Sequence, residues 1–264
     1  SREALAAMRA RTSHWTDAVA GDHVSTQYLR QQLYRRAESL IDDPSVPLFF
    51  GRIDYGAIPG QAREAEICHI GRRHVEAAIG DEPLVMDWRA PMALPFYRAR
   101  PGDPMGVELR RRFGFSHGAI TAYEDEHLAE PATAETSALL EAEIARPRSG
   151  PMRDIVATIQ PDQDVLVRTD LATSLAIQGA PGTGKTAVGL HRAAYLLYTY
   201  RNQLSRSGVL VLGPNDSFLS YIGDVLPALG EIDATQATIE SLVADATGLA
   251  VTGTDEAPVA VLKG

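Results

Sequence analysis

The sequence has almost no cysteine, few lysines and no long apolar run. Its one cysteine, Cys68, excludes an internal disulfide and a zinc site built from several thiolates, and the seven histidines show no metal-ligand spacing. No apolar run approaches the ~18 residues that a membrane span requires, and the first residues do not resemble a signal peptide. These absences predict a cytoplasmic protein with no membrane partner.

Charge is distributed unevenly along the chain. Residues 1–120 hold 16 arginines and 15 acids, whereas residues 121–264 hold 9 Lys and Arg against 19 acids, a net charge of −10. An acidic surface disfavours broad contact with a phosphate backbone. The composition therefore favours a protein partner, and it predicts that any contact with DNA is weak.

The sequence does contain a glycine-rich loop, Gly179-Ala-Pro-Gly-Thr-Gly-Lys-Thr186, preceded by an apolar run and followed by an amphipathic one. This G-x-x-x-x-G-K-T pattern predicts a phosphate-binding loop for ATP or GTP. Glycines let several N–H groups converge on one point, where the next helix adds the positive end of its dipole. Lys185 is expected on the β- and γ-phosphates and the Thr186 hydroxyl on Mg²⁺, and these two are the candidate catalytic residues. The expected nucleotide-binding residues of the loop are Gly179, Ala180, Pro181, Gly182, Thr183, Gly184, Lys185, Thr186 and Ala187.

Five regions are expected along the chain. They are a helical hairpin over 1–43, a β-rich unit over 44–125, a helical connector over 126–153, the first part of a nucleotide domain over 154–250, and an insertion or truncated end over 251–264. Within the β-rich unit, short apolar runs predict strands near 48–50, 67–70, 84–86, 95–97 and 107–115. The basic run 110–112 favours a solvated face over a phosphate contact.

The nucleotide region predicts one right-handed βαβ unit of a parallel sheet. A helix is expected from Pro161 to Arg168, a strand over 175–178, the helix after the loop from Lys185 to about Leu204, and a strand over 209–212. The unbroken apolar run of the last strand predicts burial on both faces. The fold class expected is α/β, a P-loop NTPase with an incomplete parallel-sheet core behind a hairpin and a small β-rich domain.

Two flanking segments resemble UvrD/Rep-type superfamily 1 helicases. Thr186 to Leu197 contains the His191-Arg192 pair that follows the loop in that family, and Thr158-Ile-Gln160-Pro-Asp-Gln163 is similar to its Q motif. The resemblance implies a RecA-like core, ATP with Mg²⁺ as cofactors, and adenine recognition by Gln163, with Gln160 close by. For His191, a packing role is favoured over a nucleotide-linked one.

Further segments resemble the HelD/HelR proteins, which are helicase-like ATPases of bacterial RNA polymerase. They are Phe50-Gly-Arg-Ile-Asp54, His69-Ile-Gly-Arg72, Val85-Met-Asp-Trp-Arg-Ala-Pro91 and Gly213-Pro-Asn-Asp-Ser-Phe218. The resemblance implies that residues 1–43 enter the polymerase secondary channel and that ATP turnover releases the enzyme from nucleic acid. It also implies rifamycin protection by some members. At the expected hairpin tip, Asp17 and Asp22 are read as a helix end and its cap in preference to a role at the polymerase Mg²⁺.

The chain departs from a complete helicase in three ways. Ala187 stands where many helicases carry Arg, and Gly213-Pro-Asn215 replaces a single-strand contact motif. No apolar strand ending in Asp-Glu follows to hold Mg²⁺ and polarise water, with Leu242 to Asp245 the nearest candidate. The sequence is therefore expected to be an N-terminal fragment with negligible hydrolysis of its own. Two alternatives stay open, a UvrD-type DNA helicase or translocase of DNA repair, and a polymerase-docking module in residues 1–125 that ATP only regulates.

Overall fold

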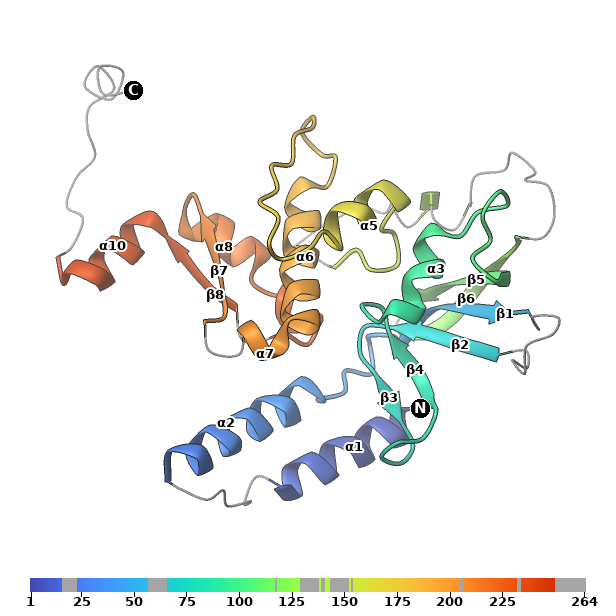
Figure 1. The fold of residues 1–264 in the computed structure, drawn as a ribbon, viewed down its shortest axis with the longest axis horizontal. Helices are drawn as coiled ribbons and strands as arrows, with labels where there is room; N and C mark the ends of the chain where they lie inside the picture. The colour runs from blue at the N-terminus through green and yellow to red at the C-terminus, as the bar shows by residue number, and fades with distance from the viewer. Residues whose placement is uncertain are drawn as a thin grey trace.

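A six-stranded, mostly antiparallel sheet organises the first half of the chain in this computed structural model (Figure 1). The structure describes residues 1–15, 23–56, 66–116, 118–128, 138, 141–142, 152, 154–204, 207–231 and 234–249. The strand order is β3-β4-β2-β1-β5-β6, and β2 and β4 form its one parallel pair. The strands are β1 Phe49–Tyr55, β2 Glu66–Gly71, β3 Val75–Glu76, β4 Pro83–Asp87, β5 Val107–Ser116 and β6 Ala119–His127.

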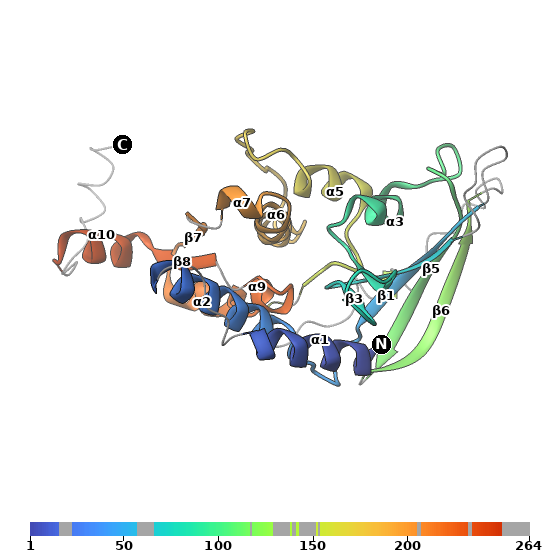
Figure 2. The ribbon, with the colours of Figure 1, turned by 60° about the horizontal axis from the view of Figure 1, so that its bottom comes forward.

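One face of this sheet is covered by a short helical segment, the 3₁₀ turn η2 (Pro91–Ala93) followed by α3 (Leu94–Arg98) (Figure 2). A side chain on Gly51 would collide with the Phe96 ring, so the glycine lets α3 lie directly on β1. The strand expected at 95–97 is wrong. Pro91 is the first residue of η2 and Pro95 the second of α3, and in a first helical turn the fixed φ of proline suits the helix and its missing N–H is not needed.

The basic run on β5 does not form one solvated face, because successive residues of a strand point to opposite sides. Arg110 is buried, donates to the carbonyls of Phe96 and Ala99, and pairs with Glu126 across the strands. Arg111 lies on the other side and forms two hydrogen bonds with Asp125. The expectation of a solvated face is therefore wrong for Arg110.

The hairpin consists of α1 (Arg2–His14) and α2 (His23–Ser39), which extend to one side below the sheet in Figure 1. A small separate core joins its base to β3 and β4. Its members are Leu5, Met8, Leu40, Val75 and Val85. Trp15, at the other end of α1, is 60% exposed. The tip with Asp17 and Asp22 lies outside the described residues, so the structure does not test their predicted roles.

The second half of the chain is mainly helical. Its elements are α5 Pro161–Val167, α6 Lys185–Thr199, α7 Arg201–Leu204, β7 Val209–Gly213, α8 Asp216–Ile222, α9 Val225–Ala228, β8 Ala234–Thr238 and α10 Ile239–Thr247. The helices expected near 161–168 and 185–204 are present, the second with a break at Tyr200. β7 and β8 pair in parallel.

Two expectations for the parallel sheet are wrong. Residues 175–178 form no strand, because no described segment supplies a hydrogen-bonding ladder to them. β7 is not buried on both faces, since Leu210 and Leu212 are 46% and 51% exposed and no described element covers them. The candidate acidic strand at 242–245 is part of α10. The described chain is thus a mixed α/β structure whose largest sheet is mostly antiparallel.

One hydrophobic core runs through both halves. Buried residues of the sheet and α3 join buried residues of α6, α8 and α9 in a single cluster, and among its members are Trp88, Tyr97, Val156, Val188, Ala194 and Leu226. β6 continues to His127, two residues into the range expected for the connector. The rest of that range is largely outside the described residues, as is 251–264.

Candidate functional site

The glycine-rich loop leads directly into α6, which begins at Lys185. Gly182 and Gly184 both have a φ of 82°, a conformation that glycine adopts without strain. A side chain on Gly179 would come within 2.8 Å of Thr183 Oγ1, which donates to the Ala180 carbonyl at 2.8 Å. The tight curl therefore depends on glycine at the positions that the sequence pattern marks.

Lys185 lies along this curl. Its ammonium group donates to the carbonyls of Gly179 and Ala180, at 2.9 and 2.8 Å. The cation is thereby held over the loop at the N-terminus of a 15-residue helix, where the helix dipole also favours an anion. Thr186 is exposed on the first turn, while Ala187 is buried beneath it. The residues present fit a phosphate group in the loop and leave the Thr186 hydroxyl accessible to a cation.

Gln163 lies against the loop, although it precedes Gly184 by 21 positions in the sequence. Its Nε2 would be 3.5 Å from a side-chain carbon placed on Gly184, and its Oε1 accepts from the Gln160 N–H at 3.1 Å. The second contact fixes the first turn of α5, since Gln160 is the residue that caps this helix. The structure therefore brings Gln163, Gln160 and the loop together.

His191 is fully buried on α6 and joins this helix to the preceding segment. Its Nδ1 lies 2.7 Å from the Ala187 carbonyl, which can only accept, so Nδ1 carries the proton. Its Nε2 accepts from the Ile155 N–H at 3.0 Å. Burial lowers the pKa of His191 below its ordinary value, and the ring packs edge-on against Trp88. These contacts are those of a packing residue.

Arg192 binds the end of α5. Its guanidinium donates to the carbonyl of Thr169, to that of Asp170 at 2.9 Å and to that of Leu166 at 3.4 Å. These carbonyls lie at and just beyond the C-terminus of α5. The last carbonyls of a helix have no partner within the helix, and here Arg192 donates to them. The His191-Arg192 pair thus connects α6 to the backbone at Ile155 and to the C-terminal end of α5.

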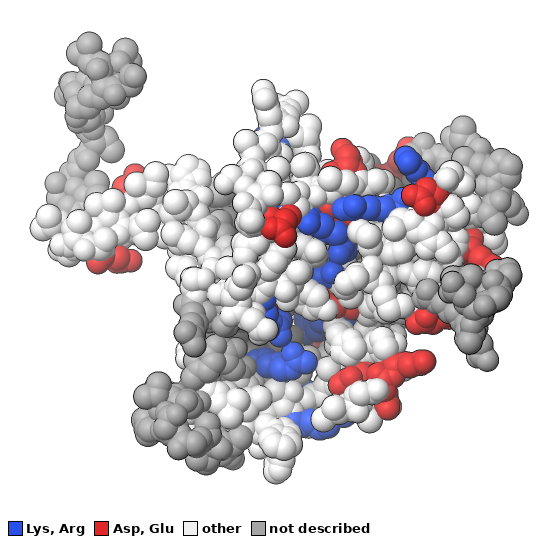
Figure 3. All heavy atoms as spheres, viewed as in Figure 1, with Lys and Arg blue, Asp and Glu red and all other residues white. Residues whose placement is uncertain are grey.

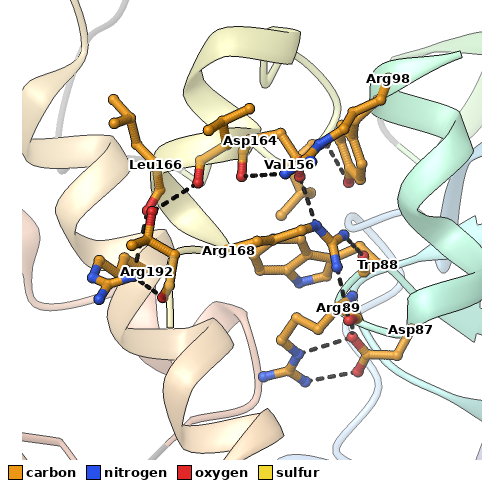
Figure 4. A network of polar contacts seen from close by, with 12 residues as sticks. Asp87, Trp88, Arg89, Arg98, Val156, Asp164, Leu166, Arg168 and Arg192 are labelled. Atoms are coloured by element: carbon orange, nitrogen blue, oxygen red, sulfur yellow. Dashed lines mark hydrogen bonds and ion pairs between the residues drawn. The ribbon is translucent and has the colours of Figure 1, made fainter. Parts of the chain in front are cut away.

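Sequence reasoning missed a set of buried ion pairs at the junction of the two halves (Figure 4). Asp164, fully buried on α5, accepts from Arg98 of α3 at 2.6 Å and from Arg168 at 2.7 Å. Arg168 also donates to the carbonyls of Trp88 and Arg89, at 2.6 and 3.0 Å. Single residues such as Arg98 carry no motif, so no sequence signal marks this set.

Arg89 forms a second buried ion pair set. It makes two hydrogen bonds to Asp87, at 2.8 and 2.7 Å, and an ion pair with Glu231, which is 142 positions away. Burial disfavours the charge of Arg89, but the two carboxylates raise its pKa above the ordinary value. Burial also raises the pKa of Glu231, and the charge of Arg89 offsets only part of that rise.

A third ion pair joins Arg72, after β2, to Asp154 at 3.0 Å. Burial favours the neutral form of Asp154, yet the charge and hydrogen bond of Arg72 hold its pKa below the ordinary value. In Figure 3, Lys and Arg side chains form a band along the middle of the face, between the sheet and the helices of the second half. The junction is thus rich in arginines that already bind carboxylates or carbonyls.

The segment 213–215, which replaces a single-strand contact motif, has a local role in this structure. Asn215 accepts from the Phe218 N–H at 2.8 Å and caps α8. Among the residues described, no three His, Cys, Asp or Glu side chains gather in a group that could hold a metal ion. No helix within the described ranges is long and apolar enough to cross a membrane.

These observations define a mixed α/β protein with a glycine-rich loop that leads into a helix bound tightly to an N-terminal sheet domain. The family described as DNA helicase IV HelD, N-terminal domain, matches residues 1–141, which is more than half of the 264 residues. The chain therefore belongs to the HelD family, a helicase-related family. A search of curated proteins finds no match to this chain.

Proposed function

We propose that this chain is the ATP-binding part of a superfamily 1 helicase-like ATPase with a RecA-like core. The observation that carries the proposal is the position of Gln163 beside Gly184, at the mouth of a loop with the G-x-x-x-x-G-K-T pattern. A glutamine amide both donates and accepts, which matches the N7 acceptor and the N6 donor of adenine, whereas the same edge of guanine presents two acceptors, N7 and O6. When Mg²⁺·ATP is bound, Lys185 would contact its phosphates and the Thr186 hydroxyl would hold the Mg²⁺.

Nucleotide titration tests this proposal directly. The 264-residue chain is expected to bind ATP weakly, to prefer it over GTP and to turn it over negligibly. Lys185→Ala should reduce ATP affinity at least tenfold, because it removes the cation that the loop holds where the phosphates are expected. Equal ATP affinity in the variant and the wild type, or turnover at the rate of a complete ATPase, would contradict the proposal.

We also propose that the partner is bacterial RNA polymerase, with residues 1–43 entering its secondary channel. In that role ATP turnover in the complete protein frees the polymerase from nucleic acid. The complete protein also protects the polymerase from rifamycin drugs. The supporting observations are membership of the HelD family and a helical hairpin that extends away from the sheet. We expect the intact chain to co-purify with core polymerase. A variant that lacks residues 1–43 should not.

A DNA helicase or translocase of the UvrD type is the alternative, and the name of the matching family, DNA helicase IV, favours it. The net charge of −10 over residues 121–264 and the use of Asn215 as a helix cap argue against it. The alternative predicts salt-sensitive single-strand binding and ATP-dependent strand separation. An unwinding assay together with the polymerase pull-down separates the two functions.

A further inference from the structure

Helix α5 has two neighbouring residues that face different parts of the molecule. Gln163 lies against Gly184 of the loop, whereas Asp164 is fully buried against the N-terminal half. A helix of seven residues has little stability of its own, so its position depends on what holds it from outside. Arg192 holds the C-terminal end of α5, and the contacts of Asp164, the neighbour of Gln163, hold the turn from which the Gln163 amide extends.

Two arginines hold Asp164, and they connect it to the sheet domain (Figure 4). Arg98, at the end of α3, donates from Nε to the Asp164 carboxylate at 2.6 Å and from Nη2 to its carbonyl at 3.3 Å. Arg168 donates to the other carboxylate oxygen at 2.7 Å and to the backbone carbonyls of Trp88 and Arg89. One carboxylate oxygen is thus bound to Arg98 directly, and the other is linked through Arg168 to the backbone at residues 88 and 89.

We propose that Arg98 is a positioning residue for base recognition, so that the N-terminal domain sets the preference for ATP over GTP. The inference rests on the proposed ATP function and adds a residue from outside the nucleotide domain to it. Arg98 holds α5 in the register that keeps the Gln163 amide against the loop. Its guanidinium contacts both the side chain and the backbone of Asp164, so it restrains the rotation as well as the place of the helix.

Arg98 is well suited to substitution. Its side chain is 31% exposed, whereas those of Asp164 and Arg168 are 0% and 7% exposed. A change at Arg98 therefore removes the restraint on α5 without opening a cavity in the shared core. Arg111 offers a matched control, since it also forms two hydrogen bonds to one aspartate, Asp125, on the outer side of the same sheet.

The experiment titrates ATP and GTP into the wild-type chain and the variants Arg98→Gln, Arg98→Lys and Arg111→Gln. In Arg98→Gln, ATP affinity should fall about tenfold while GTP affinity changes less than twofold, because the N7 and O6 edge of guanine has no donor for the Gln163 carbonyl oxygen. Arg98→Lys should restore most of the ATP preference, and Arg111→Gln should match the wild type. An ATP-to-GTP ratio in Arg98→Gln within twofold of the wild type would overturn the inference.

Amide hydrogen exchange on the nucleotide-free chain separates this inference from the proposed function. Residues 160–168 should exchange faster in Arg98→Gln and at the wild-type rate in Arg111→Gln. If the wild type binds neither nucleotide, the ATP function fails, and exchange then decides whether Arg98 positions α5. Unchanged exchange over 160–168 in Arg98→Gln would overturn the inference by itself. If Arg98→Gln does not fold, Arg98→Lys carries the same comparison with a smaller expected shift.

Discussion

At the scale of single residues, His191 illustrates how a sequence motif can serve packing. Its Nδ1–H donates to Ala187 and its Nε2 accepts from Ile155, so both ring nitrogens are used. Protonation of Nε2 would place an N–H against the N–H of Ile155. The neutral ring is therefore the form that the fold accommodates, which agrees with a pKa lowered by burial.

This contact predicts a pH dependence of stability. An unfolded histidine titrates near pH 6.5, and folded His191 titrates lower, so between these values the unfolded chain binds more protons. Stability should therefore be unaffected by His191 above about pH 6.5 and should fall below it, by at most about 1.4 kcal/mol per pH unit. Urea unfolding of the wild type and His191→Gln between pH 7.5 and 5 measures the difference.

The comparison with a second histidine makes this test specific. Burial also lowers the pKa of His69, which is half-buried on β2. His69→Gln should therefore flatten the pH profile less than His191→Gln does. A His191→Gln profile as steep as that of the wild type would contradict the account of His191.

At the scale of elements, the loop and the helices before and after it were predictable, because their signals are local. The G-x-x-x-x-G-K-T pattern marks its own turn, and Pro161 marks the start of α5. Two predictions about strands were wrong, the strand at 175–178 and the burial of β7 on both faces. Both depend on which other segments pack beside those residues, and a local pattern does not contain that information. Equally, nothing in the sequence around Arg98 indicates Asp164 as its partner.

The hairpin offers a prediction at this scale, because its base has a core separate from the main one. Leu5 is fully buried in that small core against β3 and β4. Leu5→Ala should cost about 2–5 kcal/mol locally and release α1 and α2, since a large-to-small change leaves a cavity. Hydrogen exchange should rise over residues 2–14 and 26–40 and stay unchanged in α6.

Trp88 supplies the control for that experiment. It is fully buried in the main core, whereas Trp15 is largely exposed on α1. The buried component of the tryptophan emission should keep its wavelength in Leu5→Ala, because the sheet and α6 remain packed. A red shift of that component together with faster exchange in α6 would show that the hairpin and the main core unfold as one unit, contrary to the prediction.

At the scale of the whole molecule, buried ion pairs join the two halves alongside the hydrophobic core that they share. Arg89 follows β4 of the sheet domain, and Glu231 follows α9, yet they form a buried ion pair next to Ala194 of α6. With Asp87 the set has two carboxylates that pair directly with one guanidinium, while the charge of Arg201 also acts on Glu231. Burial is the main cause of the raised pKa of Glu231, and the charge of Asp87 adds to it.

This arrangement predicts very different costs for two substitutions in this set. Arg89→Met leaves two buried carboxylates without the cation that hydrogen-bonds to both and should lower the free energy of unfolding by about 3–5 kcal/mol. Glu231→Gln leaves the neutral Arg89–Asp87 pair intact, and the new amide can still accept from Arg89, so its cost should be about 1 kcal/mol or less. Chemical denaturation at pH 7 measures both. The double variant should recover part of the loss of Arg89→Met, because it removes one of the two stranded charges. Equal costs for the two single variants would contradict this account of how the halves are held together.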